Sequence, residues 1–216
     1  MTLRNVKRGC LLVAVIFTLL QASRLPAQEK AWQIIGSLTT DRHHHEAVYI
    51  GNSRVLVIGG YTNATGVMEG IRTASCQIVD VRTKSIVDAA PLSVERGIVN
   101  AVVSSSGDVY VIGGDTDNGP SDIVERYDAL RDKWVTVGRL RVARWQQASC
   151  FISPTEILVV AGFNENRAEI FDIATGQSTL IADFPFIANQ LVPIEVLVHR
   201  PAFIGGRKSG PNTSLT

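Results

Sequence analysis

The chain has 216 residues, of which 45% are hydrophobic and 19% are charged, and its formal net charge is +1. This length allows one globular core of ordinary size rather than several domains. A charge near zero, without long runs of like charges, gives no indication of binding to nucleic acid or to an anionic membrane surface.

The first 27 residues have the layout of a secretory signal peptide. A basic start precedes an apolar stretch of 11 residues, Cys10–Leu20, which is too short for a membrane-spanning helix of about 20 residues. We predict cleavage after Ala27, so that residues 28–216 are secreted or periplasmic, with no membrane insertion after cleavage. An uncleaved anchor is the alternative, because Leu25 is less usual than alanine at its position before the cleavage site.

The remainder of the chain is built from repeats, each marked by a glycine pair after an apolar strand. The pairs are Gly59-Gly60, Gly113-Gly114, Ala161-Gly162 and Gly205-Gly206, and their second glycines are 54, 48 and 44 residues apart. In the first three copies an arginine lies 18 residues before the second glycine, at Arg42, Arg96 and Arg144. The distance from that glycine to the next turn aspartate falls from 20 to 14 to 10 residues, so the length variation is confined to one loop.

Each copy predicts four short antiparallel strands. The first strands cover residues 47–50, 101–103 and 148–152, and the second, continuously apolar strands cover 55–58, 109–112 and 157–160. The third strands alternate in polarity and end at Asp80, Asp128 and Asp172, where the carboxylate starts a turn. A fourth strand opens near Ile86 or Trp134, which completes the pattern of a propeller blade.

The segment from Val109 to Leu140 resembles the kelch repeat. It contains a Val-Tyr-Val-Ile strand, the glycine pair, Glu-Arg-Tyr-Asp, a tryptophan six residues on, and a leucine. The resemblance covers about residues 32–206 and implies an all-β, kelch-type β-propeller similar to the central domain of galactose oxidase. The residues that it marks as structural are Gly59, Gly60, Gly113, Gly114, Tyr127, Asp128, Trp134, Gly162, Phe171, Asp172, Gly205 and Gly206. Departures occur at Val79, Ala161 and Ala188.

The phase of the repeats predicts an incomplete propeller. Three full blades cover about residues 42–88, 96–138 and 144–182, part of a fourth covers 188–206, and a closing strand lies near Trp32. Because kelch-like propellers commonly have six or seven blades, the resemblance implies a truncated chain. Further blades or a second chain would be needed to close the ring.

We expect a ligand-binding face where the variable loops gather. In an antiparallel meander the start of the first strand and the end of the second share one end of the sheet, and binding residues are concentrated on such loops. The candidates are Arg42, His43, His44, Tyr61, Arg96, Asp115, Arg144, Trp145 and Asn164. For the arginines a structural role, binding backbone carbonyl groups between blades, is the alternative.

The sequence contains no recognisable catalytic or metal constellation, and we predict neither a cofactor nor a metal. Adjacent histidines on a strand point to opposite faces, so His43, His44 and His45 cannot all bind one metal ion. The copper site of galactose oxidase has no residue-by-residue match. Because Cys76 and Cys150 lie two repeats apart, we favour two buried thiols over a disulfide.

These observations favour an exported binding module for a carbohydrate or a protein partner, since the scaffold carries one variable loop face. The alternative is a carbohydrate-active enzyme of the sialic acid mutarotase type, a group of exported kelch-like propellers, with part of its site in missing blades. Its acid–base candidates are Arg42, His44, Glu95, Arg96 and Arg144.

Overall fold

The computed structural model describes residues 33–63, 70–197, 200–205 and 207–208. The chain divides into two units, Met1–Ile34 and Ile35–Thr216, and the strands of the described residues lie in the second. The described residues contain no helix and therefore none that could cross a membrane. The predicted signal peptide and its cleavage site lie outside the described residues.

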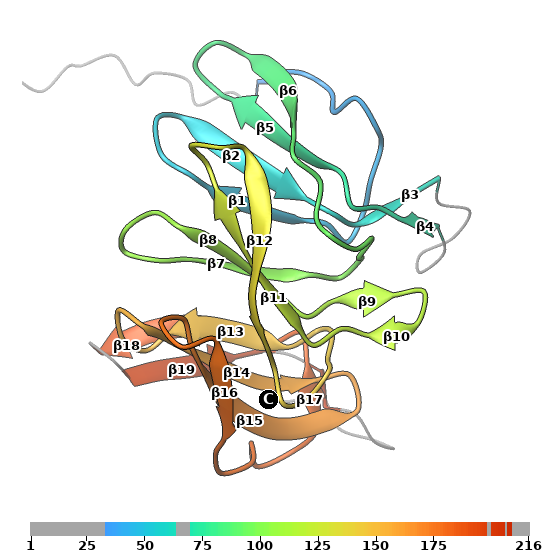
Figure 1. The fold of residues 1–216 in the computed structure, drawn as a ribbon. Coiled ribbons are helices and arrows are strands. Elements are labelled where there is room, and N and C mark those ends of the chain that lie inside the picture. Colours follow the sequence, from blue (N-terminus) through green and yellow to red (C-terminus); the bar gives the residue numbers. More distant parts are fainter. Residues whose placement is uncertain (1–32, 64–69, 198–199, 206, 209–216) are drawn as a thin grey trace, which may run out of the picture. The chain divides into compact units, whose positions relative to one another are not determined.

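Three four-stranded antiparallel sheets confirm the predicted all-β blades (Figure 1). Blade 1 consists of β1 (Glu46–Tyr49), β2 (Arg54–Ile58), β5 (Cys76–Asp80) and β6 (Ser85–Ala89). Blade 2 consists of β7 (Asn100–Val103), β8 (Val109–Ile112), β11 (Ile123–Asp128) and β12 (Lys133–Arg139). Blade 3 consists of β13 (Ala148–Phe151), β14 (Glu156–Gly162), β15 (Glu165–Asp172) and β16 (Gln177–Leu180). In each blade, strands adjacent along the chain are also hydrogen-bonded neighbours.

The predicted partial fourth blade is represented by two pairs of strands. They are formed by β18 (Val192–Leu197) with β19 (Arg200–Ile204), and by β17 (Ala188–Asn189) with β20 (Arg207–Lys208). The closing strand predicted near Trp32 is not seen in residues 33–38, which belong to no strand. Within this segment, Gly36 lies beside the Ile86 side chain of β6 in blade 1.

The hydrophobic core lies between successive sheets. Side chains along β8 point in turn to the core on either side of blade 2, which explains why its sequence is continuously apolar. Val109 and Val111 pack with Leu56 and Ile58 of blade 1. Tyr110 and Ile112, on the opposite side of the strand, pack against residues of blade 3, with Ile157, Val159 and Phe171 in the same cluster. Because neighbouring side chains point to opposite faces, a strand between two blades must be apolar at every position.

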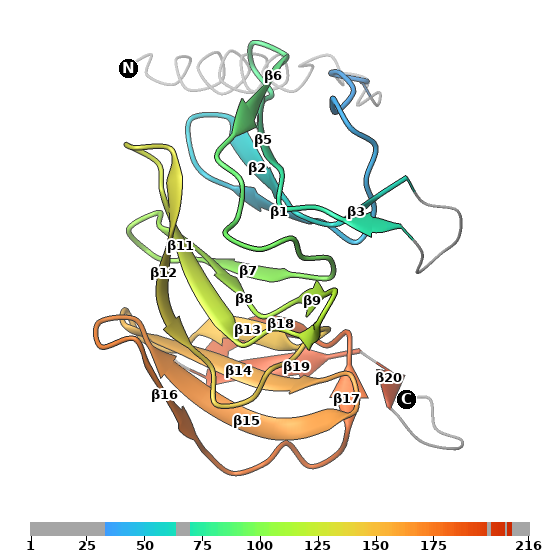
Figure 2. The same ribbon diagram turned by 45° about the vertical axis from the view of Figure 1, so that its right-hand side comes forward.

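The variable loops form short ladders of their own. In blade 1, β3 (Tyr61–Thr62) pairs with β4 (Ile71–Arg72), and in blade 2, β9 (Asp115–Thr116) pairs with β10 (Gly119–Pro120). Both ladders extend from the same end of the sheets in Figures 1 and 2. Insertions therefore lengthen a surface hairpin and leave the four strands of the blade in register.

The hairpin between the third and fourth strands of each blade turns on an aspartate, as predicted. The Oδ1 atom of Asp128 accepts hydrogen bonds from the backbone N–H groups of Leu130 at 3.2 Å and Arg131 at 3.1 Å. Asp80 and Asp172 make the same two contacts, at 2.8–2.9 Å. In all three turns the pKa of the carboxyl group lies below its usual value, and donors to the ionised oxygen are the main cause.

Candidate functional site

The loop face is the end of the sheets at which the first strand of a blade begins and the second strand ends. Residue pairing places these positions together, with Glu46 opposite Ile58 in blade 1 and Asn100 opposite Ile112 in blade 2. Isolated bridges extend this pairing outward and join His43 to Tyr61 and Gly97 to Asp115. The predicted gathering of the repeat arginines and variable loops at one end is therefore confirmed.

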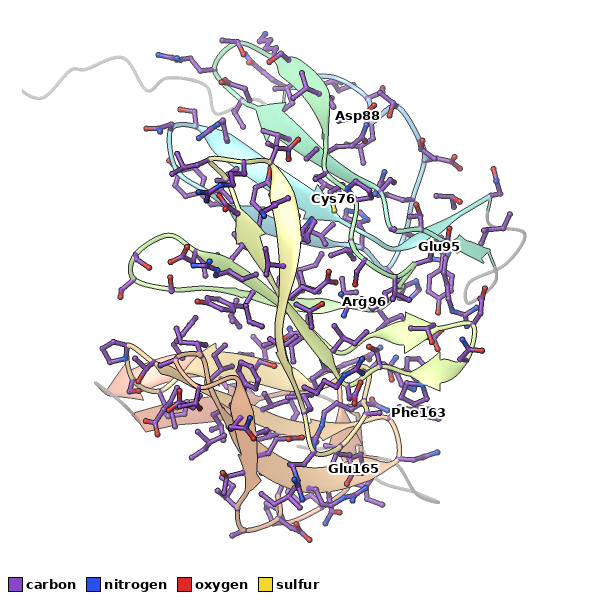
Figure 3. All side chains as sticks on the ribbon, in the orientation of Figure 1. Cys76, Asp88, Glu95, Arg96, Phe163 and Glu165 are labelled. Atoms are coloured by element: carbon purple, nitrogen blue, oxygen red, sulfur yellow. The ribbon has the colours of Figure 1, made fainter. Side chains whose placement is uncertain are left out.

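Arg96 is completely buried at the base of this face, and its guanidinium group has internal partners (Figure 3). Its Nη1 atom donates to the carbonyl oxygen of Gly113 at 2.9 Å and to that of Ile123 at 3.2 Å. Its Nη2 atom forms an ion pair with Glu125, whose side chain is also fully buried. Arg96 thus connects the end of β8 to the start of β11 in its own blade.

Arg144 repeats this arrangement in blade 3. Its Nη1 atom donates to the carbonyl oxygens of Ala161 at 3.0 Å and Arg167 at 2.7 Å, and its Nη2 atom lies 2.6 Å from Oε1 of Glu169. Both partners of the ion pair are fully buried. Burying a guanidinium group removes its hydrogen bonds to water, which costs free energy. The hydrogen bonds inside blade 3 offset part of this cost.

Arg42 occupies the equivalent position in blade 1 but is only half-buried. Its guanidinium group donates to the carbonyl oxygens of Gly59 at 3.1 Å and Ser75 at 2.8 Å, and to the Ser75 hydroxyl at 2.8 Å. The position of the buried glutamates is taken by Gln77, which binds Thr39 and, at 2.9 Å, Asp88. Blade 1 therefore has the carbonyl contacts of the other two blades without their buried ion pair.

The glycine pair is required by the backbone of the next blade. The amide of Gly114 donates to the carbonyl oxygen of Arg144 at 2.9 Å, and a Cβ atom added at Gly113 would lie 2.5 Å from that same oxygen. Gly60 and Gly59 have the equivalent contacts with the carbonyl oxygen of Arg96. The guanidinium group of each repeat arginine thus binds its own blade, and its backbone carbonyl oxygen accepts a hydrogen bond from the preceding blade.

This geometry corresponds to the structural role that the sequence left open for the arginines. Arg96 and Arg144 have no exposed surface to offer a ligand, since both are at most 1% exposed. Sequence reasoning missed Glu125 and Glu169 as their partners. Both glutamates lie three residues before the turn aspartate of their copy, so a buried acid at that constant position was a detectable signal.

A polar cluster joins the loops of blades 1 and 2. The Tyr61 hydroxyl donates to Oδ2 of Asp115, and Arg72 donates to that oxygen at 2.6 Å and to Asp117 at 2.7 Å. The Tyr61 ring lies against Gly97, where an added Cβ atom would be 2.3 Å from a ring carbon. Tyr61 is 2% exposed, so only the rim of this cluster is open to a partner.

Two of the predicted histidines lie beside this cluster. The Nδ1 atoms of His43 and His44 are 2.6 Å apart, so the N–H of one ring donates a hydrogen bond to the other, and the His43 ring stacks on Tyr61. Burial, followed by the neighbouring His43, lowers the pKa of His44. Among the described residues, no group of three or more His, Cys, Asp or Glu side chains is arranged to hold a metal ion.

Blade 3 presents aromatic side chains at the equivalent positions. The rings of Trp145 and Phe163 lie 4.6 Å apart, and the Phe163 amide donates to the Trp145 carbonyl oxygen at 3.0 Å. Phe163 is 46% exposed and lies at the loop face in Figure 3, followed by the exposed Asn164. A hydrogen bond from Arg167 lowers the pKa of the adjacent Glu165 to about 2, so this rim carries an ionised pair.

One residue near the start of each copy has a left-handed backbone conformation. His44, Ile98, Gln146 and Gln190 each lie two residues after the arginine position, and their φ angles are between 47° and 58°. The amide of Ile98 donates to the carbonyl oxygen of His44 at 2.9 Å, and that of Gln190 donates to Gln146 at 3.1 Å. The fourth copy keeps this conformation although Ala188 replaces its arginine.

The aromatic residues of blade 2 bind the link from the preceding blade. The Trp134 indole N–H donates to the Ala90 carbonyl oxygen at 3.0 Å, and the Tyr127 hydroxyl donates to Asp132 at 2.6 Å. Asp132 in turn accepts the Ala90 amide at 2.9 Å. These contacts connect the outer strands of blade 2 to blade 1, beside the packed core between the two sheets.

Residues 100–141, which span the whole of blade 2, match the family model of the Kelch motif. Blade 2 is therefore a kelch motif. A search of curated proteins found no match. In blade 1 the glycine pair and the turn aspartate of the matched segment recur, with Gln77 in place of Glu125. In blade 3 the turn aspartate and the glutamate recur, and Ala161 replaces the first glycine. Arg96, which precedes the matched residues, has its counterparts in the buried Arg144 and the half-buried Arg42.

The remaining kelch positions agree less uniformly with the motif. Phe171 is fully buried between blades 2 and 3, and Gly162 has a φ angle of 136°. Gly205 has a φ angle of 71° and Gly206 lies outside the described residues. Cys76 and Cys150 lie on β5 and β13 and are not bonded to each other, and burial raises the pKa of Cys76 to about 11.

Proposed function

We propose that the loop face binds a protein partner through the aromatic pair of blade 3. A kelch motif is typical of protein-interaction modules, and the observation that carries the proposal is the exposure of Phe163 beside Trp145. Tryptophan and other aromatic side chains supply much of the binding energy in protein interfaces, because they bury a large area at little cost in conformational entropy.

The surroundings of the aromatic pair support a preformed binding surface. Trp145 directly follows Arg144, whose guanidinium group is held by three partners in blade 3. Phe163 directly follows Gly162, the second residue of the glycine pair. Both rings are therefore attached to backbone that the repeat frame already orders, which lowers the entropy lost on binding.

The test compares wild type with Phe163→Ala in affinity capture on the intact chain. A specific partner should be retained by wild type and lost from Phe163→Ala, while Tyr49→Ala, which removes an aromatic side chain that is 63% exposed on β1, should retain it. Equal capture by all three proteins would contradict the proposal.

A carbohydrate ligand is the second possibility at the same face, because sugar rings stack on aromatic side chains. A glycan array probed with wild type and Phe163→Ala separates the two ligand classes. Binding of a defined glycan that requires Phe163, together with no retained protein, would transfer the proposal to a carbohydrate.

We place this module outside the cytoplasm, on the basis of the signal-like residues 1–27. The N-terminal sequence of the protein recovered after expression in its host tests this placement. A mature chain that begins at Gln28 is the expected result, and recovery of the intact N-terminus from the cytoplasm would contradict it. We further propose that additional blades or a second chain complete the ring beside β18 and β19.

The mutarotase-type alternative has less support from the geometry. Two of its acid–base candidates, Arg96 and Arg144, have their Nη atoms engaged in buried contacts with carbonyl and carboxylate oxygens. The Nδ1 atom of His44, a further candidate, is engaged with the Nδ1 atom of His43.

A further inference from the structure

Each blade has two faces, which pack on different neighbours. We call the face that packs on the following blade the forward face, and in blade 2 it includes Tyr110 and Ile112. The rear face packs on the preceding blade, and in blade 2 it includes Val109 and Val111. Among the described residues, no further blade precedes blade 1 or follows the β18–β19 ladder. The rear face of blade 1 and the forward face of this ladder therefore lack the neighbour that covers such faces elsewhere in the chain.

The rear face of blade 1 is exposed on its first strand, β1. Ala47 and Tyr49 of β1 are both exposed, Tyr49 at 63%. The same positions of blade 2 are taken by Ala101 and Val103, which are partly buried in the core shared with blade 1. Tyr49 thus carries a large ring at a position where the equivalent residue of blade 2 packs on a neighbour.

The β18–β19 ladder exposes a face of the opposite kind. Phe203 packs toward blade 3, in the core cluster that contains Val160. Val192 and Ile204 lie opposite each other on the other side of the ladder, and they are 57% and 55% exposed. Ile112, the counterpart of Ile204 in blade 2, is fully buried in the core shared with blade 3. The ladder therefore presents a forward face at positions that the following blade covers in blade 2.

We infer that the rear face of blade 1 packs on the forward face of the β18–β19 ladder in a second copy of this chain. The inference rests on the proposed completion of the ring beside β18 and β19, and it names the second chain. Because each copy carries one face of each kind, two copies close on each other through two such interfaces. With three complete blades and one ladder from each copy, the ring lies within the roughly four to eight blades of propellers.

A contact between blades 1 and 2 gives the register of this interface near the start of the first strands. The Glu46 carboxylate of blade 1 interacts with the backbone N–H of Ala101 in blade 2. Val192 has the repeat position of Glu46, since each lies four residues after the arginine position of its copy. Ala47 has the repeat position of Ala101, five residues after the arginine position. Val192 of one copy should therefore contact Ala47 of the other.

A contact between blades 2 and 3 gives the register farther along the strands. The rings of Tyr110 on the forward face of blade 2 and Phe151 on the rear face of blade 3 lie 5.8 Å apart in an edge-to-face arrangement. Tyr49 has the repeat position of Phe151, and the partly buried Ala202 has that of Tyr110. The Tyr49 ring should therefore lie over Ala202 of the second copy, whose small side chain leaves room for it.

Sedimentation velocity of the full chain tests the interface with two opposite charges. Ala47→Lys and Val192→Glu should each weaken dimerisation of the wild type about tenfold or more, because each places an unpaired charge in an apolar contact. An equimolar mixture of the two variants should recover the dimer, since lysine then faces glutamate at one interface and wild-type faces meet at the other. Val87→Lys, which alters an exposed side chain on β6, should dimerise as wild type does.

Recovery of the dimer in the mixture also shows that both variants fold. Dimers formed by Ala47→Lys but not by Val192→Glu would indicate pairing between two β18–β19 ladders and would overturn the inference. A wild type that stays monomeric would overturn it as well, leaving further blades to complete the ring, as would a mixture that stays monomeric. Because Phe163→Ala should dimerise normally, failure of this interface and failure of the loop-face proposal are distinguishable.

Discussion

At the level of single residues, the buried glutamates neutralise the charge of the buried arginines Arg96 and Arg144. Arg96 and Glu125 are both fully buried, so neither can be compensated by water if its partner is removed. Glu125 also accepts the Ser93 amide at 3.0 Å, which connects the link between blades 1 and 2 to β11. The Glu125 carboxylate thus binds both an arginine at the base of blade 2 and the backbone of the link that precedes this blade.

Glu125→Ala should lower the free energy of unfolding by about 3–5 kcal/mol, because it leaves a buried guanidinium group without its counter-charge. Urea unfolding at neutral pH measures this loss. Asp122→Ala, which removes a partner of the exposed Arg139, should change stability by no more than about 1 kcal/mol. Similar losses in the two variants would show that the buried pair contributes no more than a surface pair.

Gly113→Ala should destabilise the protein more than Gly107→Ala does. Both glycines have positive φ angles, 58° and 90°, so each substitution costs about 1–2 kcal/mol for backbone conformation. Only Gly113 has the Arg144 carbonyl oxygen within 2.5 Å of the added Cβ atom, which should cost about 1–3 kcal/mol more. Equal thermal unfolding midpoints for the two variants would contradict this account.

At the level of elements, each blade is held by a hairpin turn that depends on an ionised aspartate. The lowered pKa values of Asp80, Asp128 and Asp172 mean that these turns favour the folded state above the pKa of an unfolded aspartate. This contribution is lost as pH falls through the lower folded values. Stability should therefore fall below about pH 4, near the usual aspartate pKa.

Asp128→Asn tests the turn, because asparagine can still accept both backbone N–H groups but cannot titrate. Its unfolding midpoint should depend less steeply on pH below pH 4 than that of wild type. Asp128→Ala should lower the midpoint at pH 7 as well, since it removes the acceptor itself. An asparagine variant with the acid sensitivity of wild type would exclude this turn as a source of the pH dependence.

At the level of the whole molecule, each blade supplies one side of a core shared with the next. In the last blade, Val192 of β18 lies directly opposite Ile204 of β19, and these side chains are 57% and 55% exposed. Exposed apolar side chains on a short two-stranded ladder favour association with another chain.

Val192→Lys should reduce concentration-dependent self-association of the chain in sedimentation velocity. A charge on this surface opposes pairing with a second apolar strand. Val87→Lys provides the matched control, because Val87 is 53% exposed on β6 of a complete four-stranded sheet. Association that is unchanged by Val192→Lys would locate the contact elsewhere.

Much of the fold could be predicted from sequence because its signals are local and repeated. The continuous apolar runs of β8 and β14, the turn at Asp128 and the glycine pair at Gly113 each depend on residues near one another in the chain. The constant distance of 18 residues from the arginine to the second glycine in three copies then indicated a repeated blade. The closing strand near Trp32 depended on a distant partner, and that prediction failed for residues 33–38.

The sequence by itself determined the blades, their order and the end at which their loops gather, since strand periodicity and loop length are properties of the chain. Only the tertiary structure decided what the polar residues there do. Burial and partners distinguish Arg96, enclosed by carbonyl and carboxylate oxygens, from Arg139, which is exposed and pairs with Asp122. Both are arginines near a strand end, and their difference arises from atoms that residues far apart in the chain bring to them.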